Sequence, residues 1–277
     1  MATTVSFPVS TASGERTVRM VYERRGSGEP LVLLHGVGHH WQAWEPVLDI
    51  LATTHEVIAA DLPGFGASAA LPDGVAYDLP GVVPVLGGFF RALGLDRPRI
   101  AGNSLGGLLS LALGRAGLVR TVTALAPAGF WTEAERRYAF GVLAGLRAGA
   151  LLLPQPTVRV LARSAVGRGA LTGAIYARPG RRSPEAVAAE TGALRGATGF
   201  AATLAAGRHT RFTEDLPDVP VTIGWGTRDR VLLRRQGVRA KQAIPGARLI
   251  RLPGCGHVPM NDDPALVARV ILDGSSR

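Results

Sequence analysis

A chain of 277 residues, 47% of them hydrophobic, is long enough to bury a sizeable core, which excludes a disordered protein and favours one large α/β domain with an inserted subdomain. No apolar run reaches the roughly 18 residues that span a membrane, and residues 1–6 lack a signal-peptide pattern, so we expect a soluble, cytoplasmic protein without a membrane partner. The single cysteine, Cys255, excludes an internal disulfide and a cysteine-rich metal site; we expect it to be a small buried filler.

The net charge of +10 is carried almost wholly by arginine, because Lys241 is the only lysine. Such a charge fits an acidic partner, for example nucleic acid, an anionic substrate or an acidic carrier protein. The arginines are scattered, however, and no basic motif is interleaved with aromatic residues. We therefore expect solvated charges and no nucleic-acid partner.

The first part of the chain alternates strands with polar loops. We expect residues 1–17 to form a first edge strand and Val18–Tyr22 to form a second strand. The apolar run Leu31–Leu34 does not alternate, which is typical of a strand buried on both faces of a parallel sheet. It leads into a loop at His35–His40.

The loop from His35 to His40 resembles a metal site at first sight, but no partner motif supplies the further ligands that zinc needs. We expect no metal there. The loop is better explained as a glycine-rich turn whose backbone N–H groups face the reacting centre, with Val37 as the donor. His35 is then expected to hold the loop by hydrogen bonds.

A helix is expected at residues 41–52, with Trp44 in the core, and a strand at residues 56–60. Asp61 follows that strand, and we expect it to hold the next Pro-Gly turn through hydrogen bonds to backbone groups. A helix is expected at residues 80–93.

A Gly-x-Ser-x-Gly pattern centred on Ser104 joins the apolar run 99–103 to the helix-forming stretch 108–113. It predicts a strand, a sharp turn and a helix, because the flanking glycines remove Cβ atoms that would collide in such a turn. The Ser104 hydroxyl would then lie at a helix N-terminus, where backbone N–H groups stabilise negative charge.

After a strand at residues 121–126, the strand pattern disappears from about residue 130 to residue 211. Helical fragments replace it, at residues 137–146, 158–166, 184–194 and 200–206. We expect residues 130–211 to form a helical cap, or lid, over a core of residues 1–129 and 212–277. Its aromatic residues would either line a pocket or pack between cap helices; they are Trp131, Tyr138, Phe140 and Tyr176.

The strand pattern resumes at residues 219–226, followed by Asp229. A helix at 232–243, a strand at 248–252 and a helix at 264–272 complete the chain, and His257 follows the last strand. Alternating strands and helices predict a mostly parallel twisted sheet flanked by helices, with the cap inserted after the sixth strand.

Ser104, Asp229 and His257 each follow a predicted strand, so a parallel sheet brings them to one edge. A serine hydroxyl needs a base to take its proton, imidazole is suited to that task, and a carboxylate fixes its tautomer. The chain order serine, acid, histidine is the order found in one fold family.

With these motifs the sequence resembles an α/β-hydrolase fold protein, over about residues 15–130 and 212–272. The resemblance is carried by His35-Gly36-Val37-Gly38, Asp61-Leu62-Pro63-Gly64-Phe65-Gly66-Ala67-Ser68, Gly102-Asn103-Ser104-Leu105-Gly106-Gly107, Gly226-Thr227-Arg228-Asp229 and Gly254-Cys255-Gly256-His257.

The resemblance implies three catalytic residues: Ser104 as nucleophile, His257 as base and Asp229 as orienting acid. It also implies an oxyanion hole from the backbone N–H groups of Val37 and Leu105. A further group is expected to line the substrate pocket: Gly36, Gly38, His39, Trp131 and Val258.

The expected activity is hydrolysis of a small-molecule carboxylic ester, thioester or lactone through an acyl-enzyme, without a cofactor. Ser104 departs from the aspartate of haloalkane dehalogenases and epoxide hydrolases. Asn103 resembles the meta-cleavage product hydrolases, which cut carbon–carbon bonds, but Val258 stands where those carry tryptophan. A carbon–carbon bond hydrolase, a biosynthetic lyase or cyclase, and a non-catalytic receptor on the same fold remain alternatives. The substrate and the oligomeric state do not follow from the sequence.

Overall fold

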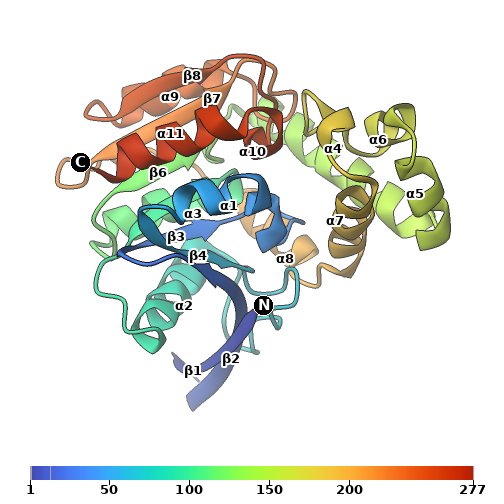
Figure 1. Ribbon diagram of the computed structural model, residues 1–277. Coiled ribbons are helices and arrows are strands. Elements are labelled where there is room, and N and C mark those ends of the chain that lie inside the picture. Colours follow the sequence, from blue (N-terminus) through green and yellow to red (C-terminus); the bar gives the residue numbers. More distant parts are fainter. Residues whose placement is uncertain (1, 13, 277) are drawn as a thin grey trace.

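The computed structural model describes residues 2–12 and 14–276 (Figure 1). In this part of the chain eight strands form one sheet, in the order β1-β2-β4-β3-β5-β6-β7-β8. The strands are β1 (Thr3–Thr11), β2 (Gly14–Arg25), β3 (Glu29–Leu34), β4 (His55–Ala60), β5 (Arg99–Asn103), β6 (Val122–Leu125), β7 (Val221–Gly226) and β8 (Arg248–Leu252). The pairs β1–β2 and β2–β4 are antiparallel, and the other pairs are parallel.

The central strands are buried on both faces, as their continuous apolar runs predict. All residues of β6 and β7 are buried, and so is Leu31–Leu34 of β3. The edge strand β1, in contrast, exposes most of its residues and buries Phe7. The parallel strands therefore end together along one buried edge, where the candidate site residues follow them.

Helices cover both faces of the sheet (Figure 1). Residues of α1 and α11 pack in one hydrophobic cluster, and residues of α2, α3 and α9 pack in the other. The core helices are η1 (Trp41–Trp44), α1 (Glu45–Leu51), α2 (Leu79–Ala92), α3 (Leu105–Arg115), α9 (Arg235–Ala243), α10 (Pro259–Asp262) and α11 (Pro264–Ser275). This arrangement confirms the expected α/β class, and Trp44 and Cys255 are fully buried as expected.

The chain between β6 and β7 is helical, and most of it forms a lobe beside the sheet (Figure 1). Its helices are α4 (Glu133–Leu152), α5 (Gln155–Ala162), α6 (Ala165–Thr172), η2 (Pro179–Arg181), α7 (Pro184–Gly196) and α8 (Phe200–Gly207). We refer to α4–α8 as the cap. The exact limits of a cap domain at residues 130 and 211 stay a prediction.

Several predicted boundaries were wrong. Residues 1–17 do not form one strand, because β2 begins at Gly14, whose positive φ of 106° suits the hairpin turn. The expected helix at 158–166 is two helices, since the Ser164 hydroxyl caps a new helix by accepting from the Gly167 N–H at 2.9 Å. Helix α4 extends well beyond residues 137–146, because a capping box of Thr132 and Glu135 starts it. Helix α10 was not predicted.

The turn between β5 and α3 leaves no room for side chains at its glycines. A Cβ atom on Gly106 would lie 2.0 Å from the carbonyl oxygen of Leu34, and one on Gly102 would lie 2.1 Å from the carbonyl oxygen of Gly106. The start of α3 is therefore pressed directly onto the end of β3. This contact brings the serine turn against the loop that follows β3.

We expect Gly106→Ala to lower the free energy of unfolding by about 3 kcal/mol or more, because the added methyl group meets backbone that cannot move independently. The same change at Gly141, on exposed α4, meets no atom within 4 Å. Gly141→Ala should raise the free energy of unfolding by ~0.5–1 kcal/mol. Urea unfolding of both variants tests this, and equal effects would contradict the packing argument.

Candidate active site

Ser104 occupies the strained turn between β5 and α3. Its φ of 56° and ψ of −112° are unusual for a residue with a Cβ atom, and neighbouring backbone groups hold it there. The Ser104 N–H donates to the Leu125 carbonyl at 2.9 Å, and its own carbonyl accepts from Leu108 at 3.0 Å and from Ala128 at 3.1 Å. The turn thus presents the Ser104 side chain at the N-terminus of α3.

His257 and Asp229 form a buried pair. The Nδ1 atom of His257 lies 2.9 Å from Oδ2 of Asp229, and a carboxylate can only accept, so Nδ1 carries the proton. The other oxygen, Oδ1, accepts from the N–H groups of Val231 and Leu232, each at 2.8 Å. The carboxylate is therefore fixed, and Nε2 of the imidazole is left with its lone pair free.

The backbone of His257 is held next to the serine turn by two elements. Nδ2 of Asn103, the residue before Ser104, donates to the His257 carbonyl at 2.9 Å and to the Leu125 carbonyl at 3.1 Å. From the cap, the Ile175 carbonyl accepts from the N–H groups of His257 at 2.8 Å and Val258 at 3.1 Å. Among the described residues no hydrogen bond joins the Ser104 hydroxyl to the imidazole.

A fully buried carboxylate, Asp262, ties the same loop to the cap. Its Oδ2 accepts from the Gly256 N–H at 2.7 Å and from the Ala177 N–H at 3.0 Å. Its Oδ1 accepts from the Arg178 N–H at 2.7 Å. Sequence reasoning missed Asp262 and Ile175, since a backbone carbonyl and a lone acid carry no local signal.

The loop after β3 lies against Ser104. A Cβ atom on Gly36 would lie 3.2 Å from Cβ of Ser104, and the next residue, Val37, lines the same cavity as Ser104. The N–H groups of Val37 and Leu105 donate to no other described residue, as an oxyanion hole requires.

His35 holds this loop, as predicted. Its Nδ1 donates to the Gly36 carbonyl at 2.7 Å, and its Nε2 accepts from the Leu62 N–H at 3.0 Å. Burial lowers the pKa of His35 to about 3, so the ring is neutral.

Asp61 also has the structural role expected of it. Its carboxylate accepts from the Trp41 N–H at 2.7 Å and from the Ala67 N–H at 2.8 Å, which ties two loops together. Burial raises the pKa of Asp61 to about 6.

A cavity of about 50 Å³ opens at Ser104. It is lined by Val37, Ser104, Leu105, Leu108, Ala128, Trp131, Ala139, Phe140, Leu143, Thr203, Leu204, Gly207, Thr210, Val231 and Leu232. We call it the serine cavity. Trp131 and Phe140 thus lie in its wall, whereas Tyr138 is exposed and Tyr176 bonds to Glu190.

The remaining predicted pocket residues lie elsewhere. Gly38 and His39 line a second cavity, which shares Val37 and Leu143 with the serine cavity. Val258 is buried and lines neither cavity, because its N–H is bound to the cap. Gly36 packs on Ser104 without lining either cavity.

A buried polar cluster, not predicted from the sequence, joins the cap to the loop after β3. Arg182 and Glu190 form an ion pair, and the Tyr176 hydroxyl donates to Glu190 at 2.9 Å. Burial lowers the pKa of His39 to about 3 and that of His40 to about 4, and in each case the nearby Arg182 charge acts in the same direction. Both rings are therefore neutral at pH 7.

No helix within the described ranges is long and apolar enough to cross a membrane. Within the same ranges, no three His, Cys, Asp or Glu side chains lie close enough together to hold a metal ion.

We expect acid to destabilise the fold through His35, His39 and His40. The unfolded chain protonates these side chains near their ordinary pKa of 6.5, while the folded chain keeps them neutral down to about 3 or 4. Stability therefore falls as pH drops below 6.5, and the raised pKa of Asp61 opposes the effect by one proton. The net slope should be roughly 3 kcal/mol per pH unit at about pH 5.

Urea unfolding at several pH values measures this slope. His40→Phe should reduce it by about 1.4 kcal/mol per pH unit, because one proton no longer binds on unfolding. An unchanged slope in this variant would contradict the burial of a neutral His40.

The profile of the alpha/beta hydrolase family matches residues 31–270. A 2-hydroxy-6-oxo-2,4-heptadienoate hydrolase of Pseudomonas putida is 43% identical over 90 residues, which is 31% of this chain and 32% of the relative. Haloalkane dehalogenase 2 of Mycobacterium tuberculosis is 27% identical over 270 residues, covering 92% of this chain and 91% of the relative.

Among solved structures, a thermophilic esterase from Thermogutta terrifontis is similar with a TM-score of 0.77 at 20% identity. The likeness covers 98% of this chain and 97% of the esterase, and it shows the fold. Because the family profile spans most of the chain, from β3 to α11, the protein belongs to the alpha/beta hydrolase family, a family of hydrolases.

Proposed function

We propose that this protein is a serine hydrolase that cleaves a small-molecule carboxylic ester, thioester or lactone through an acyl-enzyme. One arrangement carries the proposal: Ser104 lies in a strained turn, and Asn103, the residue before it, is hydrogen-bonded to the His257 backbone. The His257 side chain is paired with Asp229. These are the three parts that nucleophilic catalysis by serine needs.

In the proposed acylation step, Nε2 of His257 takes the Ser104 proton as the hydroxyl oxygen attacks the carbonyl carbon. Asp229 stabilises the imidazolium that forms, because its carboxylate already faces Nδ1 at 2.9 Å. The N–H groups of Val37 and Leu105 hold the negative oxygen, each contributing about 3 kcal/mol to the transition state. The imidazolium then gives its proton to the leaving group.

In the deacylation step, Nε2 of His257 takes a proton from water, and the resulting hydroxide attacks the acyl carbon. Ser104 leaves with the proton from the imidazolium, which restores the starting state. The cap covers the reacting centre, since α4 and α8 supply Phe140, Leu143 and Leu204 to the serine cavity. It thereby limits the water that reaches the acyl-enzyme.

The walls of the serine cavity favour a neutral substrate. Despite the net charge of +10, no Lys, Arg or His side chain is among the residues that line it. Its polar side chains are the hydroxyls of Ser104, Thr203 and Thr210. An uncharged ester therefore suits this cavity better than an anionic acid, whose charge would be buried without a partner.

Hydrolysis of a carbon–carbon bond is the second candidate, favoured by the local similarity to the heptadienoate hydrolase. Its named substrate is a carboxylate, for which the serine cavity offers no cation. Asn103, which suggested this chemistry, already has a structural task in holding the His257 loop. Dehalogenation is disfavoured because a serine stands at the turn.

The proposal predicts a single covalent adduct when the protein is exposed to a fluorophosphonate, as measured by intact-protein mass. The adduct should be absent from Ser104→Ala, because the activated hydroxyl is gone. Ester hydrolysis should fall in the same variant by at least about a thousandfold. A folded wild-type protein that neither reacts nor hydrolyses esters would contradict the proposal and favour a receptor. Turnover that survives in Ser104→Ala would favour acid–base chemistry, as in a lyase.

Asp262 should position the base, since it fixes the N–H of Gly256 next to His257. Asp262→Asn places an NH₂ group where a carboxylate oxygen now accepts. We expect kcat for ester hydrolysis to fall about 10- to 100-fold with a small change in KM, because the imidazole is displaced while the serine cavity is intact.

Asp263→Asn is the matched control. Asp263 caps α11 by accepting from the Leu266 N–H at 3.1 Å, and asparagine caps helices equally well. This variant should keep kcat within about twofold. If Asp262→Asn leaves kcat unchanged while it lowers the melting temperature, the carboxylate stabilises the fold without positioning His257.

A further inference from the structure

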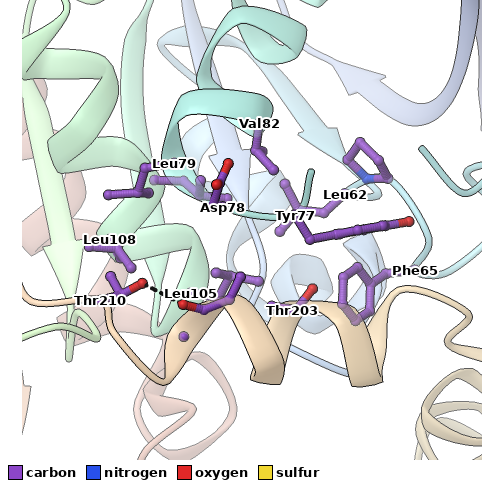
Figure 2. A pocket seen from close by; sticks show the side chains of 14 residues that line it. Leu62, Phe65, Tyr77, Asp78, Leu79, Val82, Leu105, Leu108, Thr203 and Thr210 are labelled. Atoms are coloured by element: carbon purple, nitrogen blue, oxygen red, sulfur yellow. Dashed lines mark hydrogen bonds between the residues drawn. The ribbon is translucent and has the colours of Figure 1, made fainter. Parts of the chain in front are cut away.

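A further cavity is lined on one side by Leu105 and Leu108 of α3 (Figure 2). Its walls come from the loop after β4, from the start of α2 and from α8. In Figure 2, Leu62, Leu79 and Val82 lie on the core side of the cavity, and Thr203 rises from α8 opposite them. We call this cavity the tail lobe.

The tail lobe adjoins the serine cavity. Five residues line both spaces: Leu105, Leu108, Thr203, Gly207 and Thr210. Leu105 is also the residue whose N–H is proposed to hold the oxyanion. The hydrocarbon chain of a substrate whose carbonyl group lies at Ser104 can therefore extend into the tail lobe.

The chemistry of the tail lobe is apolar. Most of its walls are leucine, valine, phenylalanine and proline side chains, and none of its lining residues is Lys, Arg or His. The one ionisable acid in its wall is Asp78, whose carboxylate caps α2 by accepting from the Gly81 N–H at 2.9 Å. An anionic end group would be repelled by Asp78 and would find no cation.

Thr203 marks the junction of the two cavities. Its hydroxyl is buried and makes no hydrogen bond with any described residue, although it belongs to a helix whose neighbouring side chains are apolar. A buried hydroxyl without a hydrogen-bond partner is unfavourable, because it has lost its hydrogen bonds to water. An ester oxygen of a substrate that crosses from one cavity to the other would satisfy it.

We propose that the tail lobe binds the uncharged hydrocarbon tail of the substrate, so that the enzyme acts on esters with a medium-length, unbranched apolar chain. The assignment rests on the proposed function for the identity of the reacting carbonyl. The binding of the tail itself depends only on the two adjoining cavities.

Ala206 and Ala205 allow a matched test. Ala206 lines the tail lobe and not the serine cavity, whereas Ala205, its neighbour on α8, is exposed and lines neither. Ala206→Phe fills the lobe from a surface helix, and Ala206→Leu fills it partly should the larger residue prevent folding. Ala205→Phe is the control for a new aromatic side chain on the same helix.

The experiment measures the binding of methyl butanoate, methyl hexanoate and methyl octanoate to Ser104→Ala protein by calorimetry, so that no ester is hydrolysed. Each added methylene should tighten binding by up to about fourfold, so the four extra methylenes should make the octanoate bind up to about 250-fold more tightly than the butanoate. Adding Ala206→Phe should reduce this ratio at least about tenfold, and adding Ala205→Phe should leave it unchanged.

The proposal that the tail lobe binds the substrate tail would be contradicted if neither Ala206→Phe nor Ala206→Leu changed the ratio of the octanoate and butanoate affinities. Equal affinities for the three esters would also contradict it. Because binding is measured without turnover, the two proposals fail separately. If the ratio changes as expected but the wild-type protein hydrolyses none of these esters, binding of the tail in the tail lobe is supported and the hydrolase proposal is contradicted.

Discussion

The close approach of α3 to the end of β3 is the constraint on which the site depends. Only glycine at positions 102 and 106 allows the chain to turn so sharply that Ser104 takes a positive φ and the Leu105 amide points outward. The same contact presses the loop after β3 onto the serine, with Gly36 against Cβ of Ser104. The contact between the backbone of α3 and the end of β3 thus positions the proposed nucleophile and both proposed oxyanion donors. This contact needs no flexible side chain.

The cap does more in this fold than cover the serine cavity. The carbonyl of Ile175 and the amides of Ala177 and Arg178 hold the loop that carries His257, directly or through the Asp262 carboxylate. A cap movement that broke these hydrogen bonds would also displace His257. A cap movement that keeps His257 in place must therefore leave the hydrogen bonds of residues 175–178 intact.

Charge and polarity are distributed unevenly over the molecule. The arginines that give the chain its net charge of +10 are absent from the walls of both the serine cavity and the tail lobe. The buried Arg182 is neutralised by Glu190, in a cluster that also places neutral His39 and His40 under the cap. The positive charge therefore lies away from both cavities, and the proposed substrate region is apolar and nearly uncharged.

The residue patterns alone predict the central sheet and the residues that we propose for catalysis. Continuous apolar runs identify the buried parallel strands, and polar residues directly after those strands identify Ser104, Asp229 and His257, because strand ends of one kind share an edge. Local patterns also predicted that His35 and Asp61 make hydrogen bonds within their own loops, but not that His35 also bonds to Leu62 and Asp61 to Trp41.

The hydrogen bonds that hold His257, and the cavity in which we propose that a substrate tail binds, are visible only in the folded structure. Ile175 acts through a backbone carbonyl that every residue type has, and Asp262 bonds to amides more than eighty positions away along the chain as well as to nearby Gly256. The two cavities meet at residues from α3 and α8, which are far apart in sequence. Such features depend on long-range packing, so no local pattern of residue types encodes them.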